Sequence, residues 1–144
     1  MKKYSITCEQ FKKRLSNLCI QSGLTGLPHK LRDRHILFKS MVVGMSSKKT
    51  YTEKEIDNKL NLWLDTVGQS MDVDHVTLRR QLIELGYLER NMDGSDYRLC
   101  IFGPAHTMFE PAVEEINIYE IITTTRELIE KRKQDYLRRQ KEKH

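Results

Sequence analysis

The sequence predicts a mostly helical protein with one small β-hairpin, and three observations support this fold class. Charged residues make up 31% of the 144 residues, whereas there are only 7 glycines and 3 prolines. Apolar residues recur at helical spacing in several segments. Residues 72–98 read as one helix that runs directly into a hairpin. The length and the 38% hydrophobic content suit one domain with terminal extensions.

The helix within residues 72–98 is predicted by an aspartate that can cap its first turn, by leucines at helical spacing and by a glycine that ends it. A turn at Asp93-Gly94 follows, between a strand that begins at Tyr87 and a return strand that extends to Ile101. The residues that define the helix are Asp72 or Asp74, Leu78, Leu82, Leu85 and Gly86.

Three further helices are expected before this segment. Residues 4–22 carry apolar side chains at helical intervals, and residues 29–45 form an amphipathic helix with one apolar face. Thr52 and Glu55 form a capping box ahead of an apolar stripe that ends at Val67. With a short β-like segment at Thr50-Tyr51, the order is helix, strand, helix, turn, helix, hairpin. This order predicts a winged helix-turn-helix with extra N- and C-terminal helices.

The expected organisation is an N-terminal helix in residues 1–26, a winged-helix-like domain in residues 27–103 and a helical extension in residues 104–144. Pro111 stands at a plausible first helical position, and the residues after it are apolar on several sides. The N-terminal helix or a second copy of the chain can cover such a helix. We therefore expect a homodimer built on the terminal helices.

Several short motifs between Pro28 and Arg98 resemble a known family, the domain of unknown function numbered 2087. The resemblance covers roughly half of the chain and implies a winged-helix-like fold and a role in transcription regulation, although the family has no established biochemical function. The matching motifs are Leu27-Pro28 before a basic helix, Tyr51 to Ile56, Thr77 to Ile83, Gly86 to Arg90, Asp93-Gly94 and Tyr97-Arg98.

The two arginines of the Thr77 to Ile83 motif are expected to differ in role. A helical projection at about 100° per residue places Arg79 on the apolar side, where it forms a structural ion pair with a carboxylate. Arg80 lies on the opposite side, available to a partner. The sequence therefore predicts double-stranded DNA binding through a set of polar and basic side chains. That set is Lys48, Lys49, Thr77, Arg80, Gln81, Arg90 and Arg98.

Two alternatives to DNA contact stay open for these residues. Asp74 and Glu84 share the face of Arg80 and would repel phosphate, so the face is equally consistent with a solvated helix surface. Arg90 and Arg98 can instead pair across the hairpin with Glu89 or Asp96. A separate alternative for the whole protein is a winged-helix protein-protein interaction module without nucleic-acid binding, in which the acidic helix face and the apolar terminal helices dock a partner.

The distribution of charge favours an anionic partner. From Lys131 to His144, seven basic residues face two acidic ones, a surplus equal to the formal net charge of +5. A second basic cluster occupies residues 30–49. Such clusters attract polyanions, although basic helix ends also complement the helix dipole without any function.

No catalytic, metal or cofactor motif is recognisable. The five histidines and three cysteines have no ligand spacing, His35 reads as a core residue, and nucleotide-binding and nucleophile motifs are missing. We therefore expect no enzyme activity, no cofactor and no disulfide framework. Neither a signal peptide nor a membrane span is indicated, so the protein is expected in the cytoplasm.

Overall fold

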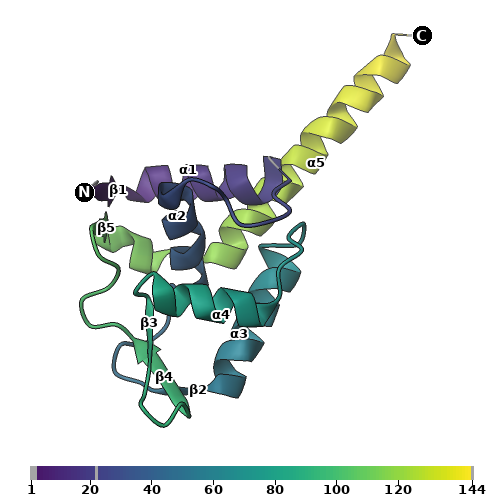
Figure 1. The fold of residues 1–144 in the computed structure, drawn as a ribbon. Helices are drawn as coiled ribbons and strands as arrows, with labels where there is room; N and C mark the ends of the chain where they lie inside the picture. The colour runs from purple at the N-terminus through teal and green to yellow at the C-terminus, as the bar shows by residue number, and fades with distance from the viewer. Residues whose placement is uncertain (1–2, 22, 144) are drawn as a thin grey trace.

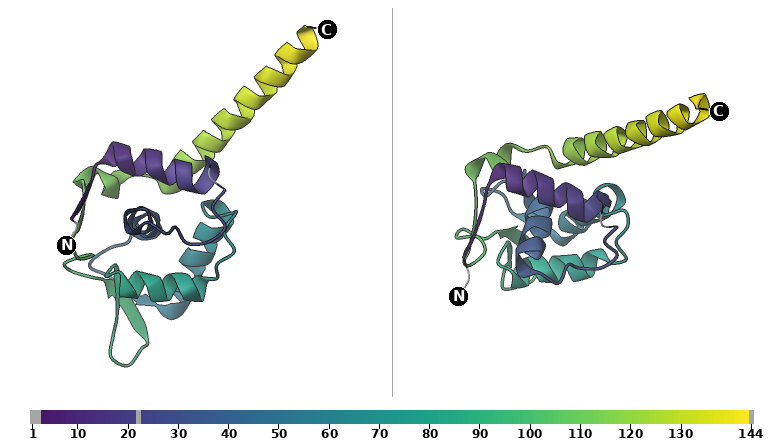
Figure 2. Two further views of the ribbon diagram at one scale, coloured as in Figure 1. Left: turned by 45° about the horizontal axis from the view of Figure 1, so that its top comes forward. Right: turned by 90° about the horizontal axis from the view of Figure 1, so that it is seen from above.

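The computed structural model describes residues 3–21 and 23–143 and shows a mostly helical chain with a small three-stranded antiparallel sheet. Helix α2 (Leu31–Val42) lies in the middle of the molecule. Seen end-on, it has α1 (Cys8–Ser16) on one side and α3 (Glu53–Thr66) and α4 (His75–Glu84) on the other (Figure 2, left). The sheet forms one end of the molecule, and the last helix projects from the other end (Figure 1).

Helix α2 is buried on several faces rather than on one. Ile36, Leu37 and Phe38 are consecutive and all fully buried, whereas Leu31, the first residue of the helix, is 45% exposed. The expectation of a single apolar stripe was therefore wrong, because helices pack on both sides of α2. A helix enclosed in this way loses the 3.6-residue pattern that an exposed face would create.

Helices α3 (Glu53–Thr66) and α4 (His75–Glu84) begin at strong capping residues. The Thr52 hydroxyl accepts from the Glu55 amide at 3.1 Å while the Glu55 carboxylate accepts from the Thr52 amide at 3.3 Å, which confirms the predicted capping box. Asp74 caps α4 by accepting from the Thr77 amide. The two helices pack together and contribute Ile56, Leu60, Trp63, Leu78 and Leu82 to the core.

The three-stranded sheet has the order β2 (Tyr51–Thr52), β4 (Asp96–Leu99), β3 (Leu88–Arg90). Strands β3 and β4 form the predicted hairpin. Its turn uses Gly94 with φ +78°, a conformation that favours glycine. The return strand ends at Leu99 and not at Ile101, which lies in a turn and is 78% exposed.

The N-terminal segment differs from its prediction. Strand β1 (Tyr4–Ile6) pairs in parallel with β5 (Thr107–Phe109), where a continuous helix over residues 4–22 was expected. Thr7 then caps α1 (Cys8–Ser16), which runs into the π-helical turn η1 (Asn17–Gln21). The apolar positions fitted a helix, but the backbone partners of β1 lie about 100 residues later in the sequence, so no local pattern predicts the pairing. Ser22 lies outside the described residues.

The C-terminal helix is interrupted near its start. Pro111 opens a short 3-10 helix, η2 (Pro111–Glu115), and Asn117 caps a separate helix α5 (Ile118–Glu142). Val113, Ile118 and Ile122 are buried, and both η2 and α5 contact α1. The N-terminal helix thus covers this part of the extension, while the rest of α5 extends beyond the body (Figures 1 and 2). In the described part of the chain, no helix is both long and apolar enough to cross a bilayer.

Candidate nucleic-acid interface

The outer face of α4 carries three of the predicted site residues. Thr77 and Arg80 are exposed, and Gln81 is half-buried and donates to Glu84 at 3.1 Å. At the start of the same helix, the hydrogen bond from the Thr77 amide lowers the pKa of the Asp74 carboxyl, so this carboxylate is ionised at neutral pH. The face therefore presents one guanidinium between two carboxylates.

Arg79 points to the opposite side of α4, towards α3. Its guanidinium forms a close ion pair with Asp57 and lies 3.3 Å from a carboxylate oxygen of Glu53. His75, one turn earlier on α4, has its Nε2 atom 3.8 Å from the second oxygen of Asp57. Because Arg79 is held in this way, its neighbour Arg80 is turned outward.

The same contacts tie the sheet to the two helices. The Tyr97 hydroxyl, on β4, donates to a carboxylate oxygen of Glu53 at 3.2 Å, and that oxygen is the one that Arg79 approaches. Tyr97 is buried, so a tyrosine ring and an ion-pair cluster connect β4, α3 and α4. The orientation of the hairpin relative to α4 is therefore fixed by side chains and not only by the short connection after Gly86.

Both hairpin arginines are engaged within the hairpin. Arg98 pairs with Glu89, its cross-strand neighbour, at 3.0 Å, which is the pairing considered as the alternative to DNA contact. Arg90 folds over the turn, where its Nε donates to the Gly94 carbonyl at 3.1 Å and its guanidinium lies 5.7 Å from the centre of the Tyr97 ring. Side chains exposed in this way remain within reach of a partner, but their charges are partly compensated.

Lys48 and Lys49 lie in the exposed loop before β2. The Lys49 ammonium is 5.9 Å from the centre of the Tyr51 ring, and Tyr51 stands opposite Tyr97, which in turn stands opposite Arg90. The structure thus links Lys49 to Arg90 through one cross-strand row of the sheet. Thr77, Arg80 and Gln81 lie on α4, whereas the two lysines, Arg90 and Arg98 lie in the sheet or in the loop before it, so the candidate residues form two groups.

Charge is distributed unevenly over the molecule. Residues 40–125, which contain α3, α4 and the hairpin, hold eight basic and fourteen acidic side chains. Residues 1–39 hold nine basic and two acidic ones, and residues 126–144 hold eight basic and four acidic ones. The surplus of positive charge therefore belongs to α1, the start of α2 and α5. Of these regions, only the C-terminal tail and residues 30–49 were predicted to be basic clusters.

Two residues of the basic N-terminal region are used internally. Arg14 donates to both oxygens of the buried carboxylate of Asp33, at 2.8 and 2.9 Å, and this lowers the pKa of Asp33. Arg34 donates to the Pro28 carbonyl at 2.6 Å. The pairing of Asp33 was not predicted, because its partner lies on another helix and no local pattern marks it.

The described residues contain no group of three histidine, cysteine, aspartate or glutamate side chains placed to hold a metal ion. Burial raises the pKa of Cys19 to about 12, and burial together with Glu89 raises that of Cys100 to about 11, so both thiols are protonated at neutral pH. His35 is buried, with its Nδ1 atom 2.8 Å from the Tyr87 hydroxyl, and burial lowers its pKa.

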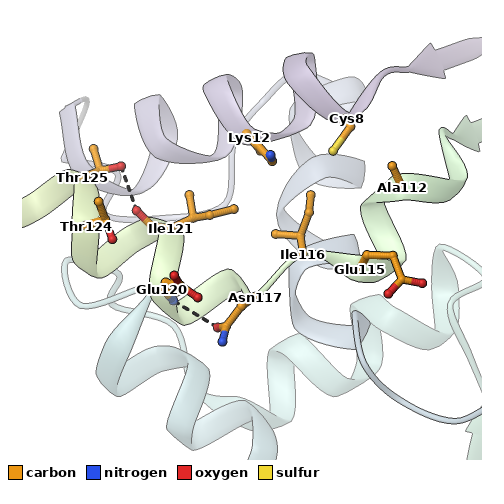
Figure 3. A pocket seen from close by; sticks show the side chains of 10 residues that line it. All are labelled: Cys8, Lys12, Ala112, Glu115, Ile116, Asn117, Glu120, Ile121, Thr124 and Thr125. Carbon is orange, nitrogen blue, oxygen red and sulfur yellow. Dashed lines mark hydrogen bonds between the residues drawn. The ribbon is translucent and has the colours of Figure 1, made fainter.

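A hollow of about 580 Å³ lies away from the hairpin, between α1 and the segment of η2 and α5 (Figure 3). Cys8 and Lys12 face it from α1, and Ile116 and Ile121 face it from the other side. The remaining lining is polar except for one alanine and includes two carboxylates. These further residues are Ala112, Glu115, Asn117, Glu120, Thr124 and Thr125.

One protein family matches this chain: its model, described as "Uncharacterized protein conserved in bacteria (DUF2087)", aligns with residues 23–99. The matched segment runs from the linker before α2 to the end of β4, so it contains the outer face of α4 and the hairpin. No curated protein and no solved structure matches the chain. The residues that line the hollow and the whole of α5 lie outside the matched residues.

Proposed function

Because the chain belongs to the family of uncharacterised bacterial proteins DUF2087, whose description names no activity, we propose a function from the structure itself: a DNA-binding transcriptional regulator of the winged-helix type. In this proposal α4 is the recognition helix and the hairpin of β3 and β4 is the wing. Such a regulator acts in the cytoplasm, where bacterial DNA lies.

The arrangement of elements supports the proposal. Helix α2, strand β2, helices α3 and α4 and strands β3 and β4 follow one another in the winged-helix order, and β2 pairs with β4 beside the hairpin. An α-helix such as α4 is about 10–12 Å in diameter with its side chains and fits the major groove, which is about 12 Å wide.

The observation that carries the proposal is the difference in contacts between the two adjacent arginines. Arg79 is fully engaged with α3, and Arg80 and Thr77 stand exposed on the outer face of α4. Arginine reads guanine through two hydrogen bonds, and threonine and glutamine offer further contacts to base edges. The engaged arginines of the wing and the lysines before β2 serve as phosphate contacts in this proposal.

Fluorescence anisotropy with labelled duplex DNA tests this function. We expect the logarithm of the affinity to fall linearly with the logarithm of the salt concentration, and Arg80→Ala to weaken binding about 5- to 100-fold, as loss of a base contact does. Lys13→Ala is the matched control. It removes one exposed positive charge from α1, which lies away from α4 and the hairpin (Figure 1), and should change the affinity by less than twofold.

Equal losses for the two variants would indicate that the positive N-terminal region, and not α4, binds the duplex. Competition with unlabelled RNA in the same assay separates a duplex-DNA partner from an RNA partner.

The acidity of residues 40–125 favours a second candidate, a winged-helix module that binds a protein. Asp74 and Glu84 flank Arg80, and Glu89 compensates Arg98, so the face around α4 would attract a basic protein surface more readily than phosphate. Lack of duplex binding at 50 mM salt by the folded protein would favour this candidate, because electrostatic binding to DNA is strongest at low salt.

A further inference from the structure

Most of helix α5 has no covering element within its own chain. The helix has 25 residues, about 37 Å at 1.5 Å per residue, and its C-terminal part projects beyond the body (Figures 1 and 2). Residues 126–143 are called the arm below. The arm exposes four large apolar side chains, at 36–61% of their surface: Leu128, Ile129, Tyr136 and Leu137.

The residues just before the arm carry the opposite charge. Residues 110–125, called the acidic segment below, contain four glutamates and no basic residue, whereas the arm contains eight basic and four acidic residues. Glu114 forms an ion pair with Lys39 of α2. Within the described residues, Glu115 and Glu120 form no ion pair, and both line the hollow beside α1.

A single chain cannot bring the arm onto its own acidic segment. Both belong largely to one helix, and an α-helix of this length does not fold back on itself. The opposite charges and the exposed apolar side chains can therefore meet only between two copies of the chain.

We propose that two copies pair through antiparallel α5 helices, so that each arm lies along the acidic segment and the adjoining hollow of the other copy. Leu128 lies near the middle of α5 and is placed near the two-fold axis, where it meets its symmetry mate. The partner's arm then brings Arg138 and Arg139 towards Glu115 and Glu120. Ile116 and Ile121 supply an apolar floor for the partner's arm.

The charges select this direction over a parallel pair. Parallel helices would place acidic segment beside acidic segment and arm beside arm, which is repulsive over both halves. Among the described residues, Lys12 is the only basic one that lines the hollow, and it faces two carboxylates there. The pairing leaves the hairpin free, since the hairpin lies at the other end of the molecule (Figure 1). The dimer therefore does not depend on the proposed DNA binding.

Two charge-reversal variants of the full chain test the pairing without DNA. The first is Glu115→Lys with Glu120→Lys, and the second is Arg138→Glu with Arg139→Glu. The replaced side chains are all exposed, and circular dichroism verifies that each variant folds. Light scattering then measures the mass of each protein alone and of an equimolar mixture.

The wild-type chain should have twice the monomer mass of 17.1 kDa. Each variant alone should be monomeric, because its own pairing would set like charges together at both ends. The mixture should regain the dimer mass, because the reversed acidic segment of one variant meets the reversed arm of the other and the native residues meet at the second end.

Three results would overturn the proposal: a wild-type monomer at about 100 μM, dimers of each variant alone, or a mixture that stays monomeric while the wild type is dimeric. If either variant does not fold, the salt dependence of the wild-type dimer tests the pairing instead. Its dissociation constant should rise several-fold between 50 and 500 mM salt, since exposed charge pairs are screened over this range. A constant value would contradict the pairing.

Discussion

The guanidinium of Arg79 on α4 pairs with the carboxylate of Asp57 on α3, and this contact sets the direction of the neighbouring Arg80. Only 15% of the Arg79 side chain is exposed, so the pair is shielded from solvent more than a surface salt bridge. The proposed recognition surface is in this sense a consequence of a structural contact on the other side of the same helix.

We predict that Arg79→Ala lowers the free energy of unfolding by about 2 kcal/mol, because it leaves Asp57 partly buried without its partner. The neighbouring variant Arg80→Ala is the control, and it should change stability by less than about 0.5 kcal/mol, as exposed substitutions do. Urea unfolding followed by circular dichroism measures both. Equal stabilities of the two variants would show that the Arg79 contacts do not hold α4 to α3.

A second prediction concerns the packing of the single tryptophan. A Cβ added at Gly68 would stand 2.4 Å from a ring carbon of Trp63, which is almost fully buried and donates to the Ser40 hydroxyl at 3.0 Å. Gly68→Ala should therefore cost about 1–3 kcal/mol of stability and change the tryptophan fluorescence. Gly26→Ala is the matched control, because nothing lies within 4 Å of its added Cβ. It should leave both quantities nearly unchanged.

Acid should weaken the contact between α1 and α2. The hydrogen bonds from Arg14 lower the pKa of Asp33 below its ordinary value of 3.8. The stabilisation is thus fully present above about pH 4 and is lost as the pH falls through the folded-state pKa. Asp33→Asn should be less stable than the wild type at pH 7, and the difference should shrink towards pH 2 in thermal unfolding. A difference that stays constant over this range would contradict the role of the ion pair.

His35 should add a separate pH dependence at milder acidity. Burial lowers its pKa below the ordinary 6.5, so the unfolded chain takes up a proton before the folded chain does. The free energy of unfolding should therefore decrease as the pH falls below about 6.5 and level off below the folded-state pKa. His35→Gln should lack this part of the slope. Urea unfolding at intervals between pH 7.5 and 5 measures it, and identical slopes for the two proteins would rule out His35 as the source.

Local signals explain which parts of the fold the sequence could predict. The capping box at Thr52 and Glu55 and the turn at Asp93-Gly94 are each encoded within a few residues, and the structure has α3 and the hairpin there. The strand at Tyr4–Ile6 could not be predicted, because its partner Thr107–Phe109 is about 100 residues away in the sequence. The burial of α2 on several faces could not be predicted for the same reason, because the helices that cover it are distant in the sequence.

In the candidate site, too, the features encoded locally could be predicted and the contacts that depend on the fold could not. Helical projection separates Arg79 from Arg80, and the structure places the first against α3 and the second in solvent. The contact of Arg90 with the Gly94 carbonyl depends on how the hairpin closes, which spacing does not reveal. Between Glu53 and Arg98, ten acidic residues outnumber six basic ones, and the structure was needed to show that these residues lie together in α3, α4 and the hairpin.

The most direct test of the proposed function is the footprint of duplex DNA on the isotopically labelled protein, measured by NMR chemical-shift changes at low salt. We predict that the largest changes fall on the amides of Thr77, Arg80 and Gln81 and on the hairpin between Arg90 and Arg98. Changes confined to α1 and the arm of α5, or none at all, would contradict the assignment of α4 as the recognition helix.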